Sequence, residues 1–196
     1  MSVVICPGIH DLELTLSFLA ELRCEAGKRS RSQLFDALDS PSGDLLIFPA
    51  QDYPAFSAFH ILHFLRERSN VSLSPLLFIS FSAGVVGAIG AAWGWQLLGG
   101  SVKAFIAIDG WGVPLSGSFP LHRLSHDDFT HWSSSLLGGG ENSFYADPPV
   151  DHLDLWRAPQ TAQGWHISHS CVGTLPRSGL TATQFLTMLL ERYKEG

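Results

Sequence analysis

Residues 76–87 read LLFISFSAGVVG, and this stretch decides the fold. Its first four residues form an apolar run with the length of a buried strand, and glycines at three-residue spacing follow from Gly84 onward. Glycines on one face allow a helix to lie close to a sheet. The stretch therefore predicts a buried strand that turns at Ser82 directly into a helix over residues 83–98.

The same pattern, a short apolar run followed by a helical segment, recurs along the chain. The apolar runs are continuous rather than alternating, which is typical of parallel strands buried on both faces. We therefore predict one α/β domain over residues 1–196, a three-layer α/β/α sandwich around a mostly parallel sheet of about five or six strands. The predicted strands are 2–6, 45–48, 76–79 and 102–108, and the predicted helices are 12–24, 54–68, 83–98 and 181–193.

The pattern weakens between residues 112 and 165, where Gly, Pro, Ser and His dominate. A short strand is predicted near residues 143–146. Several aromatic side chains lie in residues 112–141, which we interpret as a small apolar lid or loop region over a site. The pattern recovers in the last helix, for which Thr181 is the predicted cap.

Composition excludes several classes of protein. The 196 residues include 12 Lys plus Arg and 18 Asp plus Glu, a net charge of −6, with 45% hydrophobic and 15% charged residues. This composition is typical of a compact globular chain and excludes an intrinsically disordered one. The chain has no basic run of the kind that binds nucleic acid or an anionic membrane surface. We therefore expect neither as a partner.

Cysteine usage and apolar run length indicate the compartment. Three cysteines, Cys6, Cys24 and Cys171, form an odd set without C-x-x-C spacing, which favours neither a disulfide framework nor a zinc knuckle. No stretch approaches the length of about 18 apolar residues that a membrane span needs. We expect a cytoplasmic protein without a membrane span, and the oligomeric state stays open.

The turn at Ser82 resembles the nucleophile elbow of the α/β-hydrolase family. In that pattern the nucleophile occupies a strained turn, so the residues two before and two after it must be small. Ser80 and Gly84 meet this demand, whereas Ser80 as nucleophile would have Phe78 two residues before it. The resemblance implies a reduced, cap-less α/β-hydrolase fold with Ser82 as the nucleophile.

The family's chain order of serine, acid and histidine places both partners after Ser82. Asp109 ends the strand at 102–108, at the edge where α/β sheets hold their sites, and is the leading acid. His152 lies late in the chain before a short apolar stretch, like the family's catalytic base. Alternative acids are Asp127, Asp128 and Asp147, and alternative bases are His166 and His169. The other histidines are interpreted as helix-face residues (His60, His63) or polar-loop residues (His122, His126, His131).

The resemblance also implies groups that hold the oxyanion and the substrate. The backbone N–H of Ala83 is one expected oxyanion donor, and the loop after the first strand offers the amide of Ile9 or His10. Side chains expected to contact the substrate are His10, Trp111 and Trp132, and the two tryptophans favour an apolar acyl or aromatic group.

We therefore expect a serine hydrolase that cleaves a small-molecule ester or thioester through a Ser-His-Asp triad and an acyl-enzyme, without a cofactor or a metal. One alternative is a catalytically silent binding or structural module with the same fold. Another is a His-rich metal-binding protein, because His122-x-x-x-His126-Asp127 and His166-x-x-His169-x-Cys171 are two candidate ligand clusters. Neither a P-loop nor a dinucleotide-binding glycine pattern is present.

Overall fold

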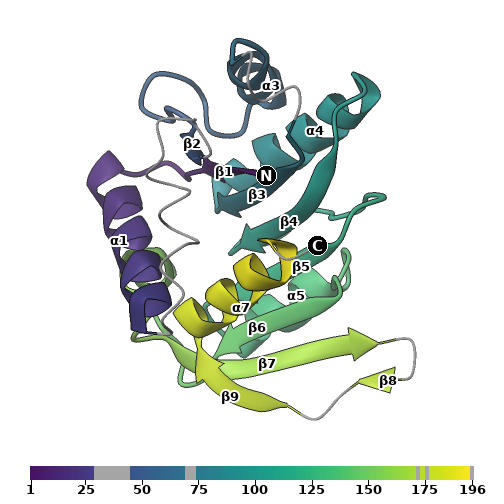
Figure 1. The fold of residues 1–196 in the computed structure, drawn as a ribbon. Helices are drawn as coiled ribbons and strands as arrows, with labels where there is room; N and C mark the ends of the chain where they lie inside the picture. Colours follow the sequence, from purple (N-terminus) through teal and green to yellow (C-terminus); the bar gives the residue numbers. More distant parts are fainter. Residues whose placement is uncertain (29–44, 69–73, 171–172, 175–176, 195–196) are drawn as a thin grey trace.

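A computed structural model describes residues 1–28, 45–68, 74–170, 173–174 and 177–194. Nine strands are assigned there, in the order β2-β1-β3-β4-β5-β6-β7-β8, with β9 also paired to β7 (Figure 1). The strands from β2 to β6 in this order run parallel, whereas β7 is antiparallel to β6, β8 and β9. The strands are β1 (Ser2–Cys6), β2 (Leu45–Ile47), β3 (Leu76–Phe81), β4 (Val102–Ile108), β5 (Leu121–Ser125), β6 (Asn142–Ala146), β7 (Gln163–Ser170), β8 (Gly173–Thr174) and β9 (Ser178–Thr181).

The α/β class and the mostly parallel sheet agree with the sequence analysis, but the sheet is larger than the expected five or six strands. The six parallel strands are extended by an antiparallel section that begins with β7. The sequence did not indicate this section, because Gly, His and Ser interrupt the apolar pattern of Gln163–Ser170.

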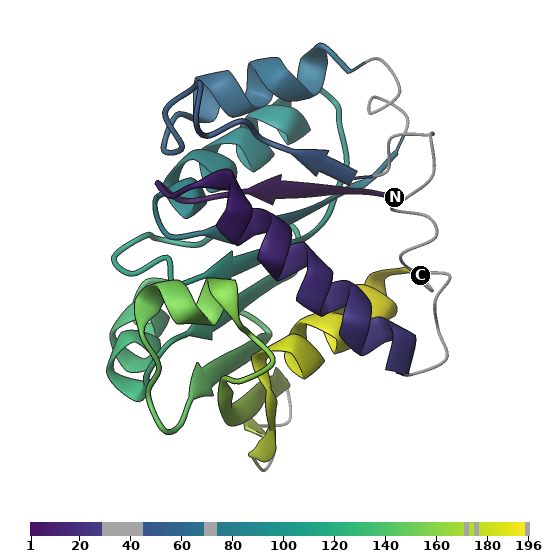
Figure 2. The same cartoon turned by 90° about the vertical axis from the view of Figure 1, so that its left-hand side faces the viewer.

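Helices cover both faces of the sheet. Alternate residues of the central strands belong to two separate core clusters: Ile5 and Ile79 to one, Val4 and Phe78 to the other. The first cluster includes side chains of α1, α6 and α7, and α1 lies beside α7 on that face (Figure 2). The second includes those of α3 and α4. The helices are α1 (Leu12–Lys28), α3 (Ala58–Arg66), α4 (Ala83–Leu97), α5 (Asp128–Ser135), α6 (His152–Arg157) and α7 (Ala182–Lys194).

Capping residues set two of the helix starts. The helix expected over residues 54–68 begins only at Ala58, because the Ser57 side chain accepts a hydrogen bond from the amide of His60. Thr181 caps α7 as expected. Its hydroxyl accepts from the Gln184 amide, while the Gln184 side chain accepts from the Thr181 amide. This reciprocal pair is a capping box.

The strand order places a topological switch point between β1 and β3. The chain leaves β1 toward β2 on one side and returns to β3 on the other. The loops that follow β1 and β3 therefore diverge at the carboxyl ends of these strands, where open α/β sheets leave a crevice for ligands. Ser82 directly follows β3, so the fold places it at this crevice.

Residues 112–141 do not form a separate lid, which corrects the expectation for this range. It contains β5, which pairs on both sides in the sheet, and α5, which packs on β5 and β6. The remaining loop is tied down: the Trp93 indole donates to the Ser116 carbonyl, and Gln96 and Ser118 share hydrogen bonds. Only the residues near Trp111 and the start of α5 border the candidate site.

The two described cysteines are free thiols that differ in solvent exposure. Cys6 is buried, and burial raises the pKa of its thiol, so the reactive thiolate is disfavoured there. Cys24 is exposed on α1, and Cys171 lies outside the described residues. Among the described helices, none has both the length and the apolar character that crossing a membrane requires.

His122 is a buried histidine rather than the loop residue that the sequence indicated. It lies on β5, fully buried, with Nε2 2.7 Å from the Tyr193 hydroxyl and Nδ1 3.4 Å from the Asn142 amide nitrogen. Burial, aided by the charge of Arg192, lowers the pKa of His122 to about 4. The imidazole is therefore neutral in the folded protein at neutral pH.

We expect His122 to destabilise the fold in acid. In the unfolded chain it gains a proton below its ordinary pKa of about 6.5, whereas in the folded chain it does so only near pH 4. Stability is therefore lost as the pH falls through this window, by on the order of 3 kcal/mol. Urea unfolding of the wild type and of His122→Gln at several pH values between 6.5 and 4 gives the free energy of unfolding of each protein as a function of pH. The wild type should lose more stability than the variant over this range, and equal losses would contradict the role of His122.

Candidate active site

The turn after β3 has the strained backbone that a nucleophile elbow requires. Ser82 has φ 52° and ψ −124°, in a region that non-glycine residues rarely occupy. Its amide continues the ladder to β4 by donating to the Ile108 carbonyl at 2.9 Å. A Cβ at Gly84 would lie 2.4 Å from the carbonyl oxygens of Cys6 and Pro7, so only glycine fits where α4 begins against the loop after β1.

Three side chains from separate elements meet at this turn. His152, the first residue of α6, places Nε2 3.1 Å from Ser82 Oγ. Its Nδ1 lies 2.8 Å from Oδ2 of Asp109, which directly follows β4. The structure thus brings together the predicted serine, histidine and acid at hydrogen-bonding distances, although they lie far apart in the sequence.

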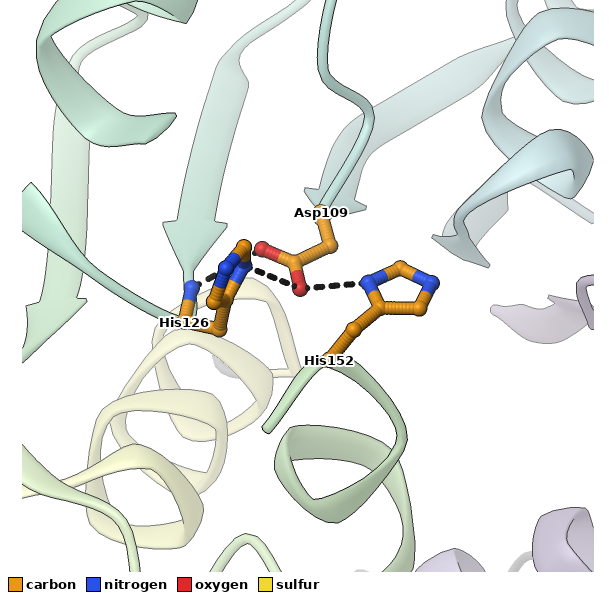
Figure 3. A group of neighbouring side chains, drawn as sticks. All are labelled: Asp109, His126 and His152. Carbon is orange, nitrogen blue, oxygen red and sulfur yellow. Dashed lines mark hydrogen bonds and ion pairs between the residues drawn. The ribbon is translucent and has the colours of Figure 1, made fainter. Parts of the chain in front are cut away.

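A second histidine, which the sequence analysis assigned to a polar loop, also binds Asp109. His126 follows β5, and its Nδ1 lies 2.9 Å from the same Oδ2 atom, while its amide donates to Oδ1 at 2.8 Å. Figure 3 shows the carboxylate between the two imidazole rings. Both carboxylate oxygens are therefore occupied, and one of them serves two imidazoles.

The electrostatics of the group determine which nitrogen atoms carry protons. Burial raises the pKa of the Asp109 carboxyl, but the hydrogen bonds from His126 and His152 outweigh it, and the pKa is lowered overall. Since an ionised carboxylate only accepts hydrogen bonds, both Nδ1 atoms must be donors. In neutral His152 the proton on Nδ1 leaves Nε2 as an acceptor that faces the Ser82 hydroxyl.

His126 is also influenced by negative charge around it. The hydrogen bond to Asp109 raises the pKa of His126, against the effect of burial, and the charges of Asp109, Asp127 and Asp151 act in the same direction. Its Nε2 lies 3.6 Å from Asp127 Oδ2. A proton on this imidazole is therefore better stabilised than on a free histidine.

The other candidate acids have different partners. Asp127 caps α5, with Oδ1 accepting from the Thr130 amide at 2.6 Å. Asp128 is exposed, and Asp147 accepts from the Trp165 indole. Of the alternative bases, His166 lies 3.1 Å from the Asn142 side-chain oxygen. The His169 side chain lies outside the described part of the chain.

The loop after β1 runs beside Ser82, where an oxyanion donor would be needed. A Cβ at Gly8 would lie 3.0 Å from the Ser82 Cβ, so the Gly8 backbone passes directly alongside the serine. Ile9 follows, with an exposed side chain. Ala83 is the first residue of α4, and amides in a first helical turn lack an intrahelical acceptor. The amides of Ile9 and Ala83 remain the expected oxyanion donors.

A pocket of about 510 Å³ opens at Ser82, within the size range of small-molecule sites. Ser82, Asp109, His126 and His152 lie on its surface with two further polar residues, Asp127 and Thr130. Its apolar lining is contributed by Ala83, Val86, Trp111, Val113 and Phe129.

The Trp111 and Val113 side of the pocket is held in place by hydrogen bonds. The Trp111 indole donates to the Ser133 hydroxyl at 3.0 Å. Arg123, buried on β5, donates to the carbonyls of Gly110, Val113, Leu137 and Gly138. Burial lowers the pKa of Arg123 to about 10, which leaves it charged at neutral pH. This buried cation joins the loop after β4 to the loop after α5.

Two of the three expected substrate contacts lie outside the pocket lining. Trp132 is 58% exposed on α5, one turn beyond Phe129. The His10 ring packs toward Phe81 and Trp156 instead, with Nδ1 2.9 Å from the Asp11 carbonyl oxygen. Trp111 alone of the three lines the pocket.

A column of aromatic rings supports the His152 imidazole. His152 stacks on Phe81 with ring centroids 4.7 Å apart, and Phe81 stacks on Trp156 at 4.9 Å. Trp156 in turn stacks on Phe18 of α1 at 3.8 Å. Because His152 and Trp156 are one turn apart on α6, the buried tryptophan anchors the helix that carries the imidazole.

One group among the described residues could offer three metal ligands, namely Asp109, His126 and His152, whose donor atoms lie within 4.8 Å of one another. These atoms are already joined by hydrogen bonds through Oδ2, an arrangement that suits shared protons (Figure 3). The cluster expected around His122 does not form, since His122 binds Tyr193. Of the other expected cluster, Cys171 and the His169 side chain lie outside the described residues.

Comparisons of the chain with protein-family models, with curated proteins and with solved structures found no match. Functional conclusions therefore depend on the fold and on the geometry around Ser82.

Proposed function

We propose that the protein is a serine hydrolase that cleaves a carboxylic ester or thioester, with a reduced α/β-hydrolase fold. Ser82 is the nucleophile, His152 the general base and acid, and Asp109 the group that orients and stabilises the imidazole. The observation that best supports this role is the continuous path from Ser82 Oγ to His152 at 3.1 Å and from His152 to Asp109 at 2.8 Å.

The reaction has two steps. His152 Nε2 accepts the Ser82 hydroxyl proton as Oγ attacks the carbonyl carbon, and the negative charge on the carbonyl oxygen is held by the amides of Ile9 and Ala83. The bond to the leaving alcohol or thiol then breaks, and the leaving group takes the proton from His152. In the second step water attacks the acyl-enzyme, gives its proton to His152, and releases the acid as Ser82 regains its proton.

The decisive test is labelling with a fluorophosphonate probe, which forms a covalent bond only with an activated serine. We expect the wild type to be labelled and Ser82→Ala not to be. Ser80→Ala is the matched control, because Ser80 lies two residues away, is fully buried and donates to the Ile106 carbonyl. It should keep its label.

Two outcomes would overturn the proposal. If the wild type is folded, as judged by circular dichroism, and still takes no label, the result would favour a silent binding module with this fold. Labelling that survives in Ser82→Ala would place the reactive serine elsewhere in the chain.

A further inference from the structure

Negatively charged side chains outnumber positively charged ones in the described lining of the pocket at Ser82. Among the residues that the structure describes, its ionisable lining consists of two carboxylates, Asp109 and Asp127, and two histidines, His126 and His152, with no Lys or Arg. The nearby Arg123 is buried and directs its guanidinium to backbone carbonyls. With neutral imidazoles the described lining therefore carries a net charge of −2, and with His126 protonated it carries −1, so it is negative in both states.

Asp127 is the carboxylate available to act on a bound substrate. Asp109 has both oxygens engaged and its side chain is only 1% exposed, whereas the Asp127 side chain is 26% exposed. Its Oδ1 is held by the cap of α5, and this contact places the carboxylate in the pocket lining. His126 Nε2 lies 3.6 Å from Asp127 Oδ2.

The rest of the lining suits hydrocarbon. Val86, Trp111 and Phe129 are each about half exposed or more, at 47%, 65% and 63%, although they are large apolar residues. Large apolar side chains that stay exposed around a pocket gain by covering an apolar ligand. Thr130 adds a hydroxyl group to the lining.

From this combination we propose that the site selects esters or thioesters of apolar acyl groups that carry no negative charge, and that Asp127 is the residue that excludes anionic acyl groups. This inference rests on the proposed hydrolase function. A carboxylate at the end of an acyl chain would lose its hydration in the pocket and face Asp127 in a lining that is negative overall and whose described residues include no Lys or Arg. A neutral or cationic end does not meet this repulsion.

Three p-nitrophenyl esters of equal chain length test this selectivity: the neutral hexanoate, the adipate monoester with a terminal carboxylate, and the hexanoate with a terminal trimethylammonium group. Each kcat/KM is divided by the rate constant for hydrolysis of the same ester by hydroxide, which corrects for differences in intrinsic reactivity among the three esters. We expect the anionic ester to be at least about 30-fold poorer than the other two. In Asp127→Asn the ratio of the normalised kcat/KM for the neutral ester to that for the anionic ester should fall by about 10-fold. The amide still caps α5 but carries no charge.

Asp128→Asn is the matched control. It removes the same charge at the next position, where the side chain is exposed and outside the pocket lining, so the gap should stay as in the wild type. An anionic ester hydrolysed as fast as the cationic one would overturn the selectivity while leaving the hydrolase function intact. A gap unchanged in Asp127→Asn would overturn the role of Asp127. If the folded protein hydrolyses none of the three esters and takes no fluorophosphonate label, the proposed function fails and this inference with it.

Discussion

Asp109→Asn is expected to lower kcat/KM for a p-nitrophenyl ester by about 10⁴-fold. The amide can present its nitrogen to His152 only as a donor, which favours the tautomer with the proton on Nε2. That nitrogen then cannot accept the proton of Ser82, which lies 3.1 Å away. The charge that stabilises the imidazolium in the transition state is also lost. Steady-state kinetics with the purified variant measures the effect.

The substitution should leave the backbone in place. Asp109 has φ 50°, a left-handed conformation that asparagine adopts as readily as aspartate. Asp128→Asn serves as control and should retain wild-type kinetics, because Asp128 is exposed and outside the pocket lining. A folded Asp109→Asn variant with kcat/KM within 10-fold of the wild type would contradict the orienting role, since such a small loss is far below that expected of a triad acid.

Trp156→Ala is expected to destabilise the protein by about 3–5 kcal/mol. Trp156 is fully buried and lies between Phe18 and Phe81, so truncation leaves a large cavity between α1, α6 and the sheet. Small domains have a total free energy of unfolding of only about 5–15 kcal/mol. Urea unfolding followed by circular dichroism measures the loss.

Trp156→Phe is the matched control for this cavity. The indole nitrogen of Trp156 has no hydrogen-bond partner among the described residues, so phenylalanine keeps the stacked ring without breaking a hydrogen bond. We expect it to lose less than half as much stability as the alanine variant. Equal losses in the two variants would show that ring stacking with Phe18 and Phe81 is not what Trp156 contributes.

The first half of the fold could be predicted because its parallel strands are local, continuous apolar runs. Residues 76–81 are all buried, and the turn that follows imposes steric demands that Ser80 and Gly84 reveal in the sequence. Asp109 could be placed for a similar reason, because the end of a buried strand is visible as the end of an apolar run.

Strand β5 could not be predicted, because three of its four buried residues, His122, Arg123 and Ser125, are polar. His122 and Arg123 occupy the strand interior, where their polar groups are satisfied by Tyr193, 71 residues away, and by carbonyls of two loops. Such partners are known only once the chain has folded. With β5 missing from the prediction, His126 could not be placed beside Asp109, although it directly follows the strand that pairs with β4.

His152 was predicted from its late position before a short apolar stretch. That stretch forms α6, which Trp156 anchors beside Phe81. Trp132 was expected to contact the substrate but lies outside the pocket lining. Its ring centroid is 6.3 Å from that of Phe129, one turn farther along α5, and only Phe129 lines the pocket.

The carboxylate oxygen that binds both His126 and His152 also determines how activity would vary with pH. Because the His126 imidazole binds Asp109 Oδ2, the protonation of His126 and that of Asp109 depend on each other. An inflection in a plot of rate against pH would therefore be a macroscopic constant of coupled groups. Assigning it to a single residue would attribute to that residue what its partner also determines.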